Sequence, residues 1–153
     1  MTTRALIDDF LARKRFAMVG VSRQANDFSR TLFRAFCQRG YEVLPVNPGA
    51  SEMEGRPCYA RIQDAPNIDA VLLMTPPKLS EAAVRQCAEA GVRTVWFYRA
   101  VGCGALSPEA VTFCESKGIQ VIAGYCPLMF LPGAEFYHRL HGFFLKLVGR
   151  YPA

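Results

Sequence analysis

Metal-binding and redox motifs are absent from this sequence. It contains two histidines, and none of its six cysteines belongs to a C-x-x-C pair. Structural zinc sites need closely spaced Cys and His ligands, and disulfide frameworks belong mostly to smaller secreted chains. Glu135, His138 and His141 share one face of a predicted helix, but no second helix supplies further ligands. We therefore expect reduced thiols and no metal ion.

Long apolar segments are also missing. The stretch at 119–134 is interrupted by Pro127 and Pro132 and is shorter than a membrane-spanning helix. Near the amino terminus, Asp8 and Asp9 stand where a signal peptide would need its apolar stretch, so this segment predicts a short amphipathic helix instead. We expect a cytoplasmic protein without membrane contact.

Two common nucleotide-binding motifs do not occur. There is no G-x-G-x-x-G, and Asn47 follows the second predicted strand where an NAD site usually has Asp or Glu. A Walker motif for nucleoside triphosphates is lacking as well. No Ser or Cys stands in a recognisable nucleophile motif, and no carboxylate pair is placed for acid–base catalysis. These absences disfavour an NAD site and favour a protein that is not an enzyme.

What the sequence does contain is a regular series of apolar runs. In 153 residues, 51% are hydrophobic and 20% charged, which is typical of a folded globular domain. The runs are rich in β-branched and aromatic residues and begin about one strand plus one helix apart. Their nearly continuous apolar character is typical of parallel strands that are covered on both faces. Five strands are predicted, at 16–21, 41–46, 69–74, 94–98 and 119–123.

Helix boundary signals separate these strands. Ser107, Pro108 and Glu109 have the order of an N-cap, a first-turn proline and a first-turn acid, and another helix is expected to start near Ser80. The segment 47–67 predicts a loop with at most a short helical turn. Three glycines stand directly before strands, as expected for left-handed helix ends: Gly40, Gly91 and Gly118.

These elements predict one α/β domain over residues 1–153. The expected fold is a Rossmann-like, doubly wound parallel sheet of five strands in the order 3-2-1-4-5, with right-handed crossovers. Its sheet and crossovers occupy 14–130. A final helix is expected at 134–150, with an apolar face that suits packing on the sheet or a homodimer through this helix.

The basic excess of the chain points to an anionic ligand. The formal net charge is +5, and residues 1–40 carry the whole surplus, with eight Lys or Arg and three Asp or Glu. The segment GVSRQANDFSR in this stretch runs from a strand into a helix, which Asp27 or Ser29 can cap. A phosphate site is favoured there over an ordinary turn, because helix-start amides, hydroxyls and cations converge. The residues concerned are Gly20, Ser22, Arg23, Ser29 and Arg30.

A family resemblance rests on five segments in a fixed order. They are FAMVGVSRQANDFSR, GYEVLPVNPGASEMEGRPCYARIQDAP, DAVLLMTPPKLSEAAVRQC, GVRTVWFYRAVG and IQVIAGYCPLMFL. Over roughly residues 15–130 the chain resembles the CoA-binding proteins related to the CoA-binding domain of the succinyl-CoA synthetase α subunit. The resemblance implies non-catalytic binding of coenzyme A or an acyl-CoA, as a sensor, carrier or partner subunit. The synthetase's phosphohistidine lies in a second domain, so no ligase activity is implied.

The same resemblance assigns roles to individual positions. It implies that the phosphates are surrounded by Gly20, Val21 and Ser22, with Arg23 and Arg30 nearby. The adenosine part would lie against Val46, Asn47 and Pro48, flanked by the turn Thr75, Pro76, Pro77 and Lys78. Prolines suit such a wall because their backbone is rigid and needs no donor.

Two alternative functions, and a reaction of the Cys126 thiol, are also to be considered from the sequence. An NAD(P)-binding oxidoreductase is the main alternative, with the arginines contacting a 2′-phosphate. A nucleic-acid-binding module has only the net charge in its favour, because aromatic and basic residues are not interleaved, and we expect no nucleic-acid partner. Cys126 stands at a strand tip, where it could form a mixed disulfide with CoA, although a packed, inert thiol is favoured.

Overall fold

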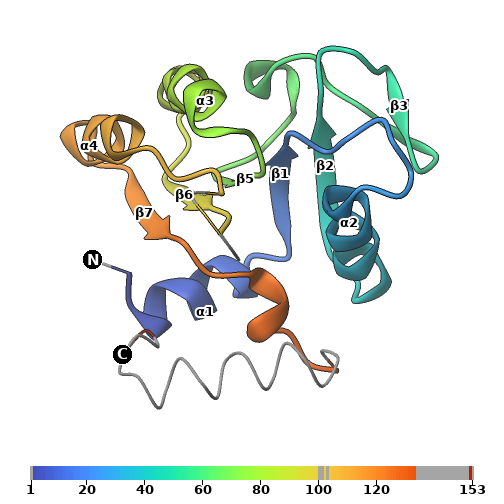
Figure 1. Cartoon of the computed structure of the whole chain (residues 1–153), viewed down its shortest axis with the longest axis horizontal. Coiled ribbons are helices and arrows are strands. Elements are labelled where there is room, and N and C mark those ends of the chain that lie inside the picture. The colour runs from blue at the N-terminus through green and yellow to red at the C-terminus, as the bar shows by residue number, and fades with distance from the viewer. Residues whose placement is uncertain (1, 100–101, 103, 134–151, 153) are drawn as a thin grey trace.

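The computed structural model describes residues 2–99, 102, 104–133 and 152 (Figure 1). The helix expected at 134–150, with Glu135, His138 and His141, lies outside the described residues. Within them, no helix is long and apolar enough to cross a membrane.

A parallel sheet forms the centre of the fold. Its strand order is β2-β1-β5-β6-β7, and every neighbouring pair is parallel. The predicted α/β class with five parallel strands is therefore confirmed. The strands are β1 (Arg15–Val19), β2 (Glu42–Val46), β5 (Ala70–Leu73), β6 (Thr94–Phe97) and β7 (Gln120–Ala123).

The predicted order of these strands is wrong. Counted along the chain, the five strands lie in the order 2-1-3-4-5 and not 3-2-1-4-5, because β5 pairs with β1 on the side away from β2. Pro45 explains why β2 is an edge strand: proline has no N–H with which to bond a second neighbouring strand. β5 is apolar throughout and fully buried, which suits an interior position between β1 and β6.

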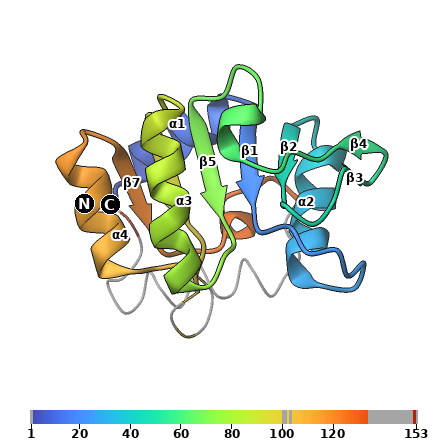
Figure 2. The ribbon, with the colours of Figure 1, turned by 90° about the horizontal axis from the view of Figure 1, so that it is seen from above.

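Helices cover both faces of the sheet, as Figures 1 and 2 show. One face packs against α1 (Arg4–Ala12) and α2 (Phe28–Gln38), through a core that includes Phe16 and Trp96. The other packs against α3 (Pro77–Glu89) and α4 (Pro108–Ser116). The side chains of each strand alternate between these two cores, which is why the strands are apolar along their whole length.

Most helix boundaries follow their predicted signals. Asp27 caps α2 through the Ser29 amide, and Ser107 caps α4 through the Ala110 amide. Gly40, Gly91 and Gly118 have φ of 80°, 74° and 70°, as expected of left-handed helix ends. The helix α3 begins at Pro77 and not near Ser80, because proline at the first helical position has a preset φ and needs no donor.

The segment between β2 and β5 contains more structure than predicted. The expected short helical turn is present as η1 (Ile62–Asp64), but a small antiparallel hairpin, β3 (Glu52–Met53) and β4 (Arg56–Pro57), was not expected. Glu54 at the hairpin tip pairs with Arg30 and Arg34 of α2. These arginines hold the pKa of the Glu54 carboxyl below its usual range, so the hairpin is fastened to α2 by charge. A second short turn, η2 (Pro127–Met129), follows β7.

Candidate functional site

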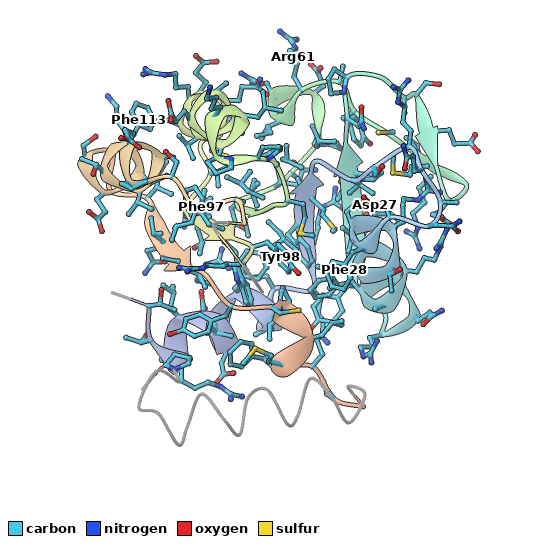
Figure 3. All side chains as sticks on the ribbon, in the orientation of Figure 1. Asp27, Phe28, Arg61, Phe97, Tyr98 and Phe113 are labelled. Atoms are coloured by element: carbon cyan, nitrogen blue, oxygen red, sulfur yellow. The ribbon has the colours of Figure 1, made fainter. Side chains whose placement is uncertain are left out.

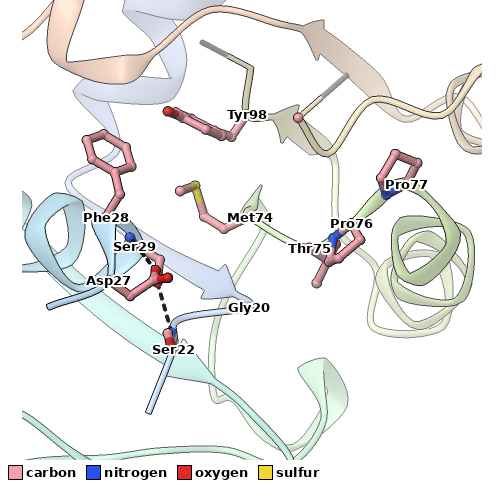
Figure 4. A pocket seen from close by; sticks show the side chains of 11 residues that line it. Gly20, Ser22, Asp27, Phe28, Ser29, Met74, Thr75, Pro76, Pro77 and Tyr98 are labelled. Atoms are coloured by element: carbon pink, nitrogen blue, oxygen red, sulfur yellow. Dashed lines mark hydrogen bonds between the residues drawn. The ribbon is translucent and has the colours of Figure 1, made fainter. Parts of the chain in front are cut away.

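A cavity of about 480 Å³ opens at the carboxyl ends of β1 and β5 (Figure 4). The chain leaves β1 toward β2 and leaves β5 toward β6, so this is the place where the strand order reverses. Ligands of open α/β sheets bind at such a point. The lining residues are Gly20, Ser22, Asp27, Phe28, Ser29, Met74, Thr75, Pro76, Pro77, Tyr98 and Gly104.

Gly20 brings the backbone of the first loop against the tip of β5. Its φ is +86°, and a Cβ added there would lie 3.0 Å from both Cγ2 and N of Thr75. Thr75 is itself held in place by a 2.9 Å hydrogen bond between its Oγ1 and the Oγ of buried Ser80. A glycine is therefore needed at position 20 for the two loops to form one wall of the cavity.

The amino end of α2 is closed by its own cap. The Asp27 carboxylate accepts hydrogen bonds from the amide and the hydroxyl of Ser29, and the amides of Arg30 and Thr31 donate to the Asp27 carbonyl. The Ser29 Oγ in turn accepts the Ser22 amide at 2.9 Å. Where open helix amides were expected, the end of α2 presents the Asp27 carboxylate, which is bonded to Ser29, and Ser29 is bonded in turn to the Ser22 amide.

Arg30 holds the loop between β1 and α2 in place through hydrogen bonds to its backbone. Its guanidinium donates to the carbonyls of Ser22, at 3.1 Å, and Arg23, at 3.4 Å, and pairs with Glu54. Its side chain is 12% exposed and does not line the cavity. In this structure Arg30 therefore positions the loop, and its predicted contact with phosphate stays a prediction.

The remaining predicted residues lie beside the cavity. Exposed Arg23 rests near Gly49, where an added Cβ would be 3.4 Å from its guanidinium carbon. Asn47 links the loop after β1 to the loop after β2. Its Nδ2 donates to the Val21 carbonyl, and its Oδ1 accepts the Gly49 amide. Of the predicted set, those in the lining are Gly20, Ser22, Ser29, Thr75, Pro76 and Pro77, and those outside it are Val21, Arg23, Arg30, Val46, Asn47, Pro48 and Lys78.

The apolar part of the cavity was not predicted as part of the site. Phe28 opens α2, Met74 follows β5 and Tyr98 follows β6; the rings of Phe28 and Tyr98 lie side by side in Figure 3, with centroids 5.6 Å apart. Burial raises the pKa of Tyr98 to about 12, so its phenol stays protonated. The rule that ligands bind at strand tips could have identified Met74 and Tyr98, but no local signal marks Phe28 or Gly104.

Cys126 is not poised for disulfide exchange with a ligand. It is 3% exposed, lies outside the cavity lining, and its pKa is raised to about 11 by burial. At pH 8 about one thiol in a thousand would be ionised. Among the described residues, no group of three or more His, Cys, Asp or Glu could hold a metal ion.

We therefore expect Cys126 to resist alkylation in the native protein. Iodoacetamide at pH 8, followed by peptide mass spectrometry, should leave Cys126 unmodified until the protein is unfolded in urea. A CoA adduct on Cys126 after diamide treatment of the native protein with CoA would contradict this expectation.

Comparisons with known proteins agree with this geometry. In sequence, the chain is 29% identical over 117 residues to acetate–CoA ligase [ADP-forming] I of Archaeoglobus fulgidus, covering 72% of this chain but only 17% of the ligase. It is 28% identical over 127 residues to the uncharacterized protein YneT of Bacillus subtilis, covering 81% of this chain and 90% of YneT. In structure, it resembles a hypothetical protein from Pyrococcus horikoshii OT3, with a TM-score of 0.75, 31% identity and coverage of 82% and 87% of the two chains.

A family model described as a CoA binding domain matches residues 14–132. That span contains the whole sheet and every residue that lines the cavity. The chain therefore belongs to the CoA-binding domain family.

Proposed function

We propose that this protein binds coenzyme A or an acyl-CoA in the cavity at the carboxyl ends of β1 and β5, without catalysing a reaction. The observation that carries the proposal is the position of the cavity, at the reversal of strand order, in a chain whose residues 14–132 match the CoA-binding domain. A role as a sensor, a carrier or a partner subunit fits this activity.

The charges around the loop suggest how the ligand lies. The Asp27 carboxylate repels phosphate from the end of α2 itself, whereas Arg23 provides a cation on the β2 side of the loop. The Ser22 Oγ accepts the Gln24 amide and has its own O–H to donate. We infer that the diphosphate lies over Ser22 and Arg23, and that the adenosine part extends toward Asn47 and Pro48.

The polar groups of the cavity support binding over catalysis. Asp27, Ser29 and Ser22 are joined in the cap of α2, and Thr75 is paired with Ser80. The Ser29 hydroxyl does donate to the Asp27 carboxylate, but Ser29 is 4% exposed and its Oγ also accepts the Ser22 amide, so we assign these bonds to holding the cap and the loop. YneT, which is nearly covered by its match to this chain, is a further protein in which such a domain makes up almost the whole length.

Titration with CoA tests the proposal. A ligand at about 100 times its dissociation constant stabilises a protein by about 2.7 kcal/mol, so CoA should raise the melting temperature while NADP and an oligonucleotide should not. Arg23→Glu should weaken CoA binding about tenfold or more, because it replaces a cation near the diphosphate by an anion.

Arg93→Glu is the matched control. Arg93 is exposed and precedes β6, at the opposite end of the strands from the cavity, so the same change of net charge should leave the affinity for CoA unaltered. Stabilisation by NADP and not by CoA would replace the proposal with the oxidoreductase alternative. Equal losses in the two variants would show that net charge alone matters.

A further inference from the structure

One end of the cavity is an apolar surface made by Phe28, Met74 and Tyr98, here called the aromatic wall. Phe28 is 39% exposed, and among the described residues Leu79 is the other large hydrophobic side chain that is exposed. Figure 4 shows the three side chains of the wall together, on the opposite side of the cavity from Pro76 and Pro77. An exposed aromatic ring inside a cavity is typical of a site for an apolar part of a ligand.

The wall lies away from the position proposed for the adenosine part. Asn47 follows β2, and Arg23, in the loop after β1, lies beside Gly49 at the same end of β2. Tyr98 follows β6, and β2 and β6 are on opposite sides of the β1–β5 pair. A ligand whose diphosphate crosses the loop at Ser22 therefore directs its other arm, which ends in the thiol of CoA, toward the aromatic wall.

We propose that the aromatic wall binds the acyl group of a short-chain thioester, so that the protein prefers acyl-CoA to free CoA. This inference rests on the proposed function. Each methylene buried on an apolar surface increases affinity about fourfold. At this end of the cavity the apolar lining consists of three side chains, an extent that suits a short chain such as acetyl or butyryl.

Tyr98 provides the polar feature of the wall. Its hydroxyl has no hydrogen-bond partner among the described residues, and in Figure 4 it points along the wall toward Phe28. A protonated phenol can donate to the carbonyl oxygen of a thioester, which free CoA lacks at its thiol end. The wall thus offers both an apolar surface and a donor to an acyl group.

Calorimetric titration of the full chain with CoA, acetyl-CoA, butyryl-CoA and adenosine 3′,5′-bisphosphate tests this inference. The wild type should bind butyryl-CoA at least tenfold more tightly than CoA, with acetyl-CoA in between. Phe28→Ala should remove most of that preference, because it should weaken the binding of butyryl-CoA by a clearly larger factor than the binding of CoA. Tyr98→Phe should reduce the preference for acetyl-CoA without abolishing it.

Leu79→Ala is the control, because Leu79 is 58% exposed on α3 and does not line the cavity. It should leave all four affinities unchanged. Equal affinity of the wild type for CoA and both acyl-CoAs would overturn the inference and leave CoA binding intact. A uniform loss for all four ligands in Phe28→Ala would also overturn it, because the adenine would then occupy the wall. Failure of every ligand to bind would refute the proposed function itself.

Discussion

Gly20→Ala is expected to lower the free energy of unfolding by about 2–4 kcal/mol and to abolish CoA binding. A side chain at φ +86° is strained by about 1–2 kcal/mol. The new Cβ would also lie 3.0 Å from Thr75 and 3.1 Å from the Met74 carbonyl carbon, closer than the packed β5 tip allows. Urea unfolding measures the loss of stability, and calorimetry measures the loss of binding.

Gly40→Ala is the control that separates the backbone strain of a positive φ from the close contact with Thr75. Gly40 has nearly the same φ, +80°, but an added Cβ there meets nothing within 4 Å. It should cost only the backbone strain and leave CoA affinity unchanged, because it ends α2 far from the cavity. If the two variants lost equal stability, the proposed contact between position 20 and Thr75 would be disproved.

Trp96→Ala is expected to have the largest effect on stability, a loss of about 3–5 kcal/mol. Trp96 is fully buried, its ring meets Phe10 edge-on at 5.3 Å, and its indole N–H donates to the Gly124 carbonyl at 2.8 Å. The change would leave a cavity beneath α1 and an unpaired carbonyl at the end of β7. Because folded domains are stable by only about 5–15 kcal/mol, such a variant should melt far below the wild type.

Trp96→Phe distinguishes the contribution of ring packing from that of the indole hydrogen bond. It retains an aromatic ring against Phe10 but removes the donor to Gly124, so about 1–3 kcal/mol should be lost. Equilibrium unfolding in urea at constant temperature gives both values. A loss below 1 kcal/mol in Trp96→Ala would mean that the β6 core does not depend on this ring.

Part of the site could be found from sequence because strand tips and loop glycines are local features. Gly20, Thr75 and Pro76 follow apolar runs directly, and they do line the cavity. Arg30 could not be assigned in this way. An arginine beside this loop can face the cavity or hold the loop, and Glu54, which the hairpin tip brings to α2, pairs with Arg30 on the side of the loop away from the cavity lining.

The sequence alone determined the five main strands, the helices that cover them and the parallel character of the sheet, and it predicted the end of the strands at which the cavity lies, but it did not indicate the β3–β4 hairpin. Apolar periodicity, caps and left-handed glycines are properties of neighbouring residues, and each acts within one turn or strand. The tertiary structure decided the strand order and the apolar half of the cavity. Phe28 and Tyr98 are 70 positions apart. They meet because the amino end of α2 and the carboxyl end of β6 lie at the same end of the strands. Such a contact depends on how all the elements pack together, which no local pattern records.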